Sequence, residues 1–152
     1  EYVIQSSRAS VRFFTDGAGK WYTDINLITG TLQTKIDGQG AIPSVGTVEA
    51  FEVPYNCTIT AAKLTADVSG SLVLDVRKIT AANYPSTSPY TAAAGTSIVA
   101  SAPPTLSSAQ SSQDATLTGW TLNLSKGDWL QVSITSVSTL FKAKLSLDIA
   151  RR

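Results

Sequence analysis

Histidine and methionine are absent from the 152 residues, and cysteine occurs once, at Cys57. Histidine is the commonest general base and metal ligand near neutral pH, so its absence excludes Ser-His-Asp and Cys-His catalysis and the usual histidine-containing zinc sites. A lone cysteine cannot form an internal disulfide, and its place in a strand-like run predicts a small buried side chain. A sequence that begins at Glu1 and lacks methionine is expected to be the C-terminal fragment of a longer protein.

Charged residues make up only 15% of the sequence, and 12 basic residues nearly balance 11 acidic ones. The basic residues are scattered, so the sequence lacks the basic face or stripe that nucleic-acid binding needs. No apolar run reaches the roughly 18–20 residues that span a bilayer, so no membrane insertion is expected. With 43% hydrophobic residues, the chain is expected to fold into an ordered domain with a substantial core.

Motifs that would identify an enzyme are missing as well. The stretch "DGAGKW" at residues 16–21 resembles a phosphate loop, but a strand-like segment follows it, whereas a phosphate loop opens a helix. Glu49 and Glu52 are three positions apart, which places them on opposite faces of a straight strand rather than side by side as a catalytic pair. No EF-hand spacing supports a calcium site. The sequence therefore predicts a non-enzymatic protein without a metal or cofactor.

Short segments that alternate apolar and polar residues recur along the chain, separated by Gly, Pro, Asn and Ser clusters. In "SLVLDVRK", for example, Leu72, Leu74 and Val76 share one strand face, and Asp75 and Arg77 share the other. This pattern is typical of half-buried antiparallel strands. We expect strands at residues 11–14, 20–25, 48–53, 58–66, 71–78, 97–100, 120–124, 128–134 and 144–149. The predicted fold is all-β: an antiparallel, jelly-roll-like β-sandwich preceded by a short aromatic β-hairpin.

The composition changes near residue 40, which divides the chain into two expected parts. Residues 1–40 form a lead-in, an aromatic hairpin with a turn at residues 16–19 followed by a Gly-rich connector, and residues 41–152 form the sandwich. An isolated hairpin is at best marginally stable in water. The lead-in therefore predicts a subunit interface, with Phe13, Trp21 and Tyr22 as its candidate residues.

Several stretches in a fixed order resemble a domain that recurs near the C-terminal ends of tailed-bacteriophage tail proteins. They are "FEVPYN", "ADVSGS", "LDVRK", "YPST", "APPTLSS", "LTGW", "KGDW" and the closing strand "AKLSLDIAR". The resemblance covers roughly residues 40–152, and the lead-in "SVRFFTDGAGKWY" is similar to a phage tail-fibre hairpin. It departs at Arg77, where we would expect a second aromatic residue. The resemblance implies a virion location on the phage tail or capsid surface, a homotrimer, and a terminal domain that meets the host surface.

Two tryptophans flank the turn in "TGWTLNLSKGDWLQVS" and are expected to differ in role. By the two-residue period Trp120 shares the face of Leu122 and Leu124, which predicts a core position. Trp129 falls on the face opposite Leu130, so it is expected to lie in an interface or a binding surface.

A long loop, residues 80–95, contains two prolines and both Tyr84 and Tyr90. Rigid flat rings can stack on a sugar, and carboxylate or amide groups can select its hydroxyls. The candidate glycan-binding residues are therefore Tyr84, Tyr90 and Trp129, with Asp75 and Asn83 as hydroxyl partners. The plainer alternative is that the two tyrosines only anchor the loop onto the sandwich.

The leading functional hypothesis is a non-enzymatic virion domain at the distal end of a tail fibre, which binds a host-surface glycan or holds a homotrimer together. A second hypothesis is a capsid decoration or head-fibre protein, in which the lead-in docks onto other virion proteins. A third is a carbohydrate-binding module of a secreted polysaccharide-degrading enzyme. Sandwich folds serve many functions, so the fold alone does not choose among the three.

Overall fold

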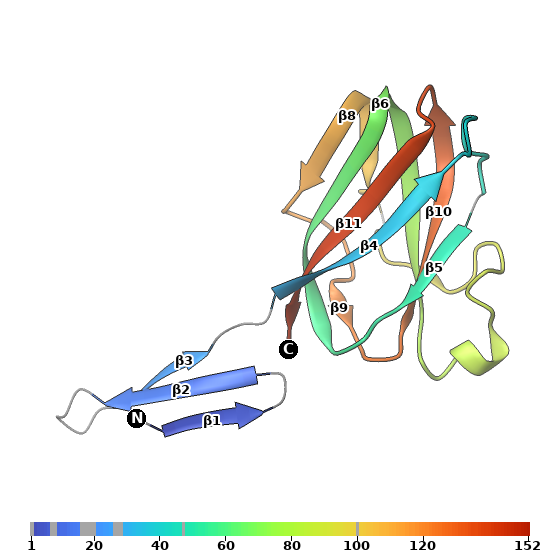
Figure 1. Cartoon of the computed structure of the whole chain (residues 1–152). Coiled ribbons are helices and arrows are strands. Elements are labelled where there is room, and N and C mark those ends of the chain that lie inside the picture. Colours follow the sequence, from blue (N-terminus) through green and yellow to red (C-terminus); the bar gives the residue numbers. More distant parts are fainter. Residues whose placement is uncertain (1, 7–8, 16–20, 26–28, 47, 100) are drawn as a thin grey trace.

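The computed structural model describes the backbone of residues 2–6, 9–15, 21–25, 29–46, 48–99 and 101–152, and the side chains of residues 29–46, 49–99 and 101–152. This part of the chain contains eleven β-strands and one short 3-10 helix and has no α-helix (Figure 1). All strand pairs are antiparallel. The predicted all-β, antiparallel fold class is confirmed.

The lead-in forms a three-stranded sheet in the order β1-β2-β3. It consists of β1 (Tyr2–Ser6), β2 (Ala9–Thr15) and β3 (Trp21–Ile25). The expected hairpin is the β2–β3 pair, in which Phe14 lies opposite Tyr22. Strand β1 was not expected. The predicted interface side chains of Phe13, Trp21 and Tyr22 lie outside the described side chains, so their role stays a prediction.

A second sheet of eight strands holds the rest of the chain, with its main path in the order β4-β11-β6-β10-β5. These strands are β4 (Thr29–Asp37), β5 (Val48–Glu52), β6 (Cys57–Ile79), β10 (Trp129–Ser138) and β11 (Lys142–Arg151). Strand β4 pairs with β11 along its whole length. Its residues were expected to belong to the connector of the lead-in, but the sheet already begins there.

Strand β6 is 23 residues long and serves both halves of the sheet. Its first half pairs with β11 and its second half with β10, and the register with β8 shifts at Gly70 between them. Two strands separated by a tight turn were expected here. The chain instead bends without leaving the sheet, because a glycine at this position lets it pass close to the β10–β11 connection. A Cβ on Gly70 would lie 2.7 Å from the carbonyl oxygen of Ser138.

Three further strands pair with the other edge of β6: β7 (Thr96–Ser97), β8 (Thr105–Asp114) and β9 (Asn123–Leu124). Strand β8 follows the bend, because its end pairs with the first half of β6 and its beginning with the second half. The sheet therefore curls over on itself into two facing layers, a sandwich-like arrangement (Figure 1). Strand β8 was missed in the sequence because only Leu106 in it is buried, which leaves no alternating pattern.

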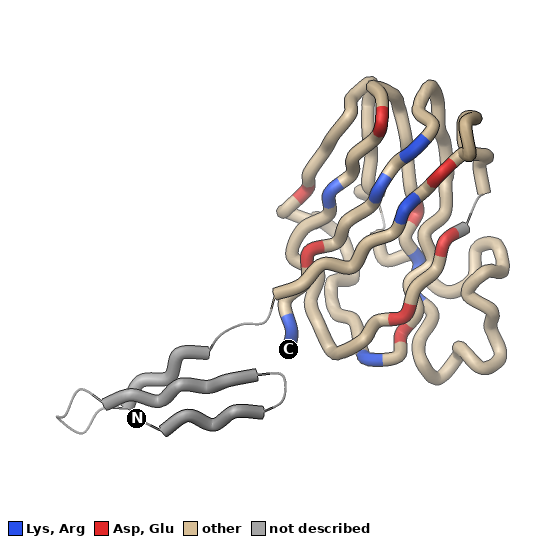
Figure 2. The backbone as a smooth tube through the Cα atoms, in the orientation of Figure 1, with Lys and Arg blue, Asp and Glu red and all other residues tan. Residues whose placement is uncertain are grey.

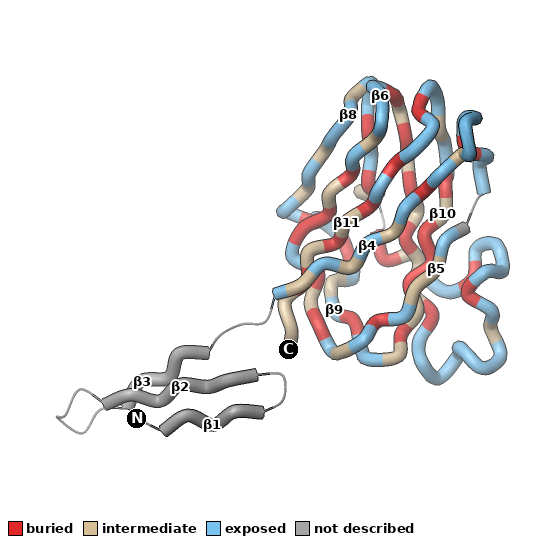
Figure 3. Tube along the Cα trace, viewed as in Figure 1, coloured by how far each residue is buried: buried red, intermediate tan, exposed pale blue. Residues whose placement is uncertain are grey.

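The hydrophobic core lies between the two layers (Figure 3). Leu64 and Leu147 of one layer and Leu74 and Leu130 of the other belong to one buried cluster. The predicted burial of Cys57 is confirmed, since its side chain belongs to this cluster and has no exposed surface. Burial also raises the pKa of its thiol.

Trp120 is 8% exposed and its indole N–H donates to the carbonyl of Ala102 at 2.8 Å, so the predicted core position is confirmed. The expected strand position was wrong, because Trp120 precedes β9 and does not lie in a strand. A turn, rather than the two-residue period of a strand, places the Trp120 ring in the core.

The Asp67 carboxylate joins the bend of β6 to the connection between β10 and β11. One of its oxygens accepts the backbone N–H groups of Val68, Phe141 and Lys142 at 3.0–3.2 Å. Desolvation by itself raises the pKa of Asp67, but these donors outweigh it and hold the pKa below the ordinary value of 3.8.

In the described part of the chain no helix is long and apolar enough to cross a membrane.

Candidate functional site

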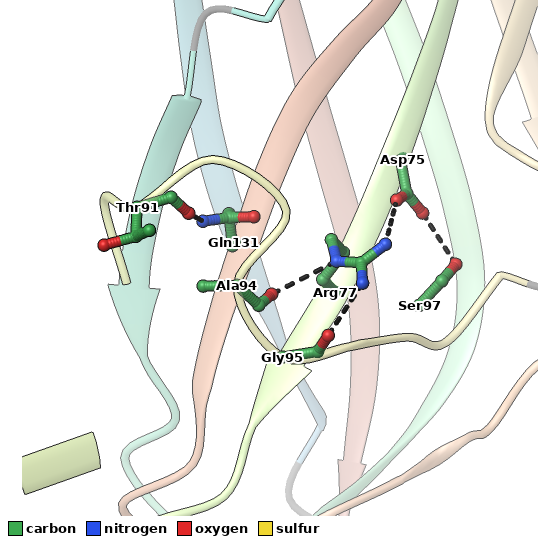
Figure 4. A network of polar contacts seen from close by, with 7 residues as sticks. All are labelled: Asp75, Arg77, Thr91, Ala94, Gly95, Ser97 and Gln131. Atoms are coloured by element: carbon green, nitrogen blue, oxygen red, sulfur yellow. Dashed lines mark hydrogen bonds and ion pairs between the residues drawn. The ribbon is translucent and has the colours of Figure 1, made fainter. Parts of the chain in front are cut away.

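The loop of residues 80–95 is held against the outer face of β6 by Arg77 (Figure 4). The Arg77 guanidinium donates to the carbonyl of Ala94 at 3.1 Å and to that of Gly95 at 2.7 Å. It also pairs with Asp75 at 3.0 Å, and Asp75 in turn accepts the hydroxyl of Ser97 at 2.6 Å. A planar guanidinium with fixed donor directions can make these contacts at once, which a lysine cannot.

Gln131 on β10 holds the middle of the same loop. It lies directly across from Arg77 and is fully buried, and its amide nitrogen donates to the carbonyls of Pro89 at 2.6 Å and Thr91 at 2.7 Å. Two donors directed at loop carbonyls fix which end of the amide is the nitrogen. Its amide oxygen has no protein partner. The loop therefore lies over two side chains, Arg77 and Gln131, that donate hydrogen bonds to its backbone carbonyls.

The aromatic residues of the loop meet β10 at the first residue of that strand. Tyr84 opens the 3-10 helix Tyr84–Ser86, and its ring stacks on that of Trp129 with the centroids 4.8 Å apart and the planes 11° from parallel. Nearby, the buried Asp128 carboxylate accepts the backbone N–H of Ala81 at 3.2 Å and that of Ser125 at 2.9 Å. The beginning of the loop is thus fixed to the start of β10.

A surface hollow of about 450 Å³ opens where the loop meets Trp129, and we call it the aromatic hollow. Tyr84 is 42% exposed and Tyr90 is 61% exposed, so both rings present a face to solvent. The hollow is lined by Tyr84, Pro85, Ser86, Thr87, Ser88, Pro89, Tyr90 and Trp129. Its lining combines aromatic rings and proline with hydroxyl groups, and no side chain in it carries a charge.

Of the five predicted glycan-binding residues, the structure brings three together: Tyr84, Tyr90 and Trp129. Asp75 does not line the hollow, because its carboxylate is engaged by Arg77 and Ser97 under the far end of the loop. Asn83 precedes the 3-10 helix and also lies outside the lining, and its side chain makes no capping hydrogen bond. Neither residue lines the hollow, and their role as hydroxyl partners stays a prediction.

The residues that shape this site were missed in the sequence. Arg77 was placed on the same strand face as Asp75 and noted as a departure from an expected aromatic residue, and no role was predicted for Gln131. Both lie at outward positions of alternating strands, next to a long loop whose carbonyl groups need donors. That combination is the signal that could have identified them.

A second surface feature is a set of exposed lysines on β4 and β11, two strands on which Figure 2 marks basic positions. Lys35 and Lys144 lie directly opposite each other across the β4–β11 pair. Asp37 pairs with Lys35 at 2.9 Å and with Lys142 at 3.9 Å. The hydrogen bond from Lys35 is the main cause that lowers the pKa of Asp37. We call Lys35, Lys142 and Lys144 the lysine face.

Within the described part of the chain, no group of three or more acidic, Cys or His side chains is placed to hold a metal ion. The aromatic hollow itself offers no general acid, base or nucleophile with a charged partner. Its rings and hydroxyls suit the binding of a ligand with apolar and hydroxyl-bearing surfaces.

Comparisons with known proteins add little. No family model matches the chain, and no curated protein matches it. Among solved structures it is similar to a chain in the complex of the Aeromonas sobria serine protease (ASP) with the chaperone (ORF2). The TM-score is 0.33, the identity is 8%, and the match covers 95% of this chain and 37% of the other. A likeness this weak carries no argument.

Proposed function

We propose that this chain is a non-enzymatic virion domain at the distal end of a phage tail fibre and that it binds a host-surface glycan in the aromatic hollow. The observation that carries the binding role is the joining of Tyr84, Tyr90 and Trp129 in one hollow. The virion role rests on the resemblance of residues 40–152 to domains of tailed-phage tail proteins, and with it comes the proposal of a homotrimer.

Stacking on a sugar requires flat rings that do not move when the ligand binds. Trp129 is the first residue of β10, which pairs with β5 on one side and with β6 on the other, and Tyr84 is packed face to face on it. The loop that carries Tyr84 and Tyr90 is fastened by Arg77 and Gln131. Because folding already orders the rings, little further conformational entropy is lost when a ligand binds, and this favours binding.

The plainer alternative, that the tyrosines only anchor the loop, accounts for part of the geometry. Tyr84 does help to anchor the loop, because it stacks on Trp129. Tyr90 is 61% exposed, and an anchoring ring would be buried. A large exposed ring beside a second exposed ring is what a binding surface needs.

The test is capture of oligosaccharides on an array, followed by titration calorimetry with a captured oligosaccharide. Tyr90→Ala and Trp129→Ala are expected to lower affinity about tenfold or more, since aromatic residues at the centre of a contact dominate its binding energy. Phe141→Ala is the matched control, because Phe141 is also a 40% exposed aromatic but lies beyond the other end of β10. Equal affinity of all three variants and the wild type would contradict the binding role.

The homotrimer is tested separately by light scattering after size exclusion. A mass about three times that of the 16.0 kDa chain is expected. A monomer at all concentrations would remove the trimer from the proposal, while leaving the glycan titration as the test of binding.

A further inference from the structure

Two described charged side chains, Arg77 and Asp128, bond the backbone of the loop, and both are engaged by the protein itself. Arg77 gives its donors to Ala94, Gly95 and Asp75. The two oxygens of Asp128 each accept a backbone N–H group, and this side chain is buried. None of these charges lines the aromatic hollow.

The polar side-chain groups of the lining residues are uncharged: the hydroxyls of Ser86, Thr87, Ser88 and the two tyrosines, and the indole N–H of Trp129. Two of these hydroxyls already have a protein partner, since Ser86 donates to the carbonyl of Asn83 at 3.2 Å and Ser88 accepts the backbone N–H of Tyr90 at 3.3 Å. A hydroxyl can donate and accept, so it matches the hydroxyl of a neutral sugar in either direction. It cannot neutralise a carboxylate or phosphate. An acidic sugar would lose part of its hydration in the hollow without gaining an ion pair, which is costly.

Glu52 does not line the hollow, but it lies next to Trp129 on the neighbouring strand. Glu52 of β5 is directly opposite Trp129 of β10, so the two side chains project from the same face with Cβ atoms about 5 Å apart. Glu52 is exposed, and none of the ion pairs among the described side chains includes it. Its carboxylate therefore sets a negative charge at the tryptophan end of the hollow.

We infer that the aromatic hollow takes an uncharged glycan and that Glu52 helps to exclude acidic ones. This inference rests on the proposed glycan-binding role and names the class of sugar. For an assumed separation of about 8 Å in water, repulsion by Glu52 disfavours a negative group about twofold to threefold at low ionic strength, where salt screens the charges least. The unpaired desolvation of the acidic group raises the total discrimination to about tenfold.

The experiment begins with an array of neutral and acidic oligosaccharides. A captured neutral oligosaccharide is then titrated calorimetrically beside its own C6-oxidised (uronate) form, so that the two probes differ in one group. The wild type is expected to bind the uronate form about tenfold more weakly. Glu52→Gln should recover about twofold to threefold of that loss and leave the affinity for the neutral form unchanged.

Glu49→Gln is the control for the change of net charge. Glu49 lies opposite Val132, on the other face of the same strand, so its removal takes away the same charge at a position that does not face the hollow. The inference predicts no change in either affinity for this variant. An equal effect of Glu49→Gln and Glu52→Gln would overturn the role of Glu52.

The outcomes separate this inference from the function it rests on. If no oligosaccharide is captured, the proposed glycan role fails and the inference falls with it. If an acidic glycan is captured and Tyr90→Ala abolishes that capture, binding in the hollow stands and the preference for uncharged glycans is overturned. A third outcome is that an acidic glycan is captured equally well by Tyr90→Ala and less well by Lys144→Gln. That result would place the acidic glycan at the lysine face, and it would agree with exclusion of acidic glycans from the hollow.

Discussion

Replacement of Arg77 with alanine is expected to release the loop of residues 80–95 while the core between the layers stays intact. The change removes two hydrogen bonds to loop carbonyls, at 3.1 and 2.7 Å, and an ion pair with Asp75 at 3.0 Å. Among the described side chains, no other charged group makes a hydrogen bond or ion pair with the end of the loop near Gly95. The core residues on the opposite face of β6 are untouched.

The magnitude follows from the exposure of the groups involved. A hydrogen bond from a charged donor is worth about 1.5–3 kcal/mol, and these two lie at the lower end because about a quarter of the Arg77 side chain is exposed. The ion pair is similarly exposed, so it adds at most about 1 kcal/mol. We expect Arg77→Ala to lower the free energy of unfolding by about 2–4 kcal/mol, and Arg77→Lys by roughly half as much because one ammonium cannot replace the planar fork.

Urea denaturation gives the free energy of unfolding, and limited proteolysis reports on the loop. Cleavage within residues 80–95 should become faster in Arg77→Ala under native conditions. Lys63→Ala serves as the control, since it removes an ion pair with Asp148 on the other layer and touches no loop carbonyl. A loss below about 0.5 kcal/mol together with unchanged proteolysis would refute the view that Arg77 holds the loop.

Three further changes test other parts of the fold. Trp120→Phe removes the indole donor to Ala102 and part of a buried ring, and is expected to cost about 1–3 kcal/mol in urea denaturation. Gly95→Ala places a Cβ 2.3 Å from a carbonyl oxygen of β6 at a φ of +72°, so a loss of about 2 kcal/mol or more is expected, and a neutral effect would show that the loop can shift. The folded-state pKa of Asp67 is lowered, so its stabilising effect is full above the ordinary value of 3.8 and is lost as pH falls through the folded pKa. The difference in melting temperature between the wild type and Asp67→Ala should therefore be largest at neutral pH and shrink in acid, and a pH-independent difference would contradict this assignment.

The strands that could be predicted from the sequence are those that carry the core. The alternation in residues 71–78, 129–134 and 144–149 places one apolar side chain inward at every second position, and burial follows it closely. Strand β8 shows why other strands could not be predicted. It is held by backbone pairing with β6 and by the bend at Gly70, neither of which leaves a hydrophobic period in a serine-rich segment.

The candidate site was only partly predictable for a related reason. The aromatic residues of the loop and Trp129 could be recognised because exposed rings have few structural reasons to be there. Asp75 was assigned to the ligand because an outward carboxylate on a strand looks free in a sequence. Arg77 lies two residues further along the same strand face and was already within reach, but Ser97 becomes a neighbour only when the chain after the loop returns to pair with β6 as β7.

An outward strand face that is polar is usually read as a face in water, and here that reading misleads. The second half of β6 and the start of β10 are covered by the loop, and a loop brings backbone carbonyls that need donors when they are covered. Arg77 and Gln131 supply those donors, whereas apolar side chains at the same positions would leave the carbonyls unpaired. The polar residues are thus what allows a long, proline-containing loop to lie still on a sheet. A loop held in this way can keep Tyr84 and Tyr90 exposed and rigid, and this is the condition that an aromatic binding surface must meet.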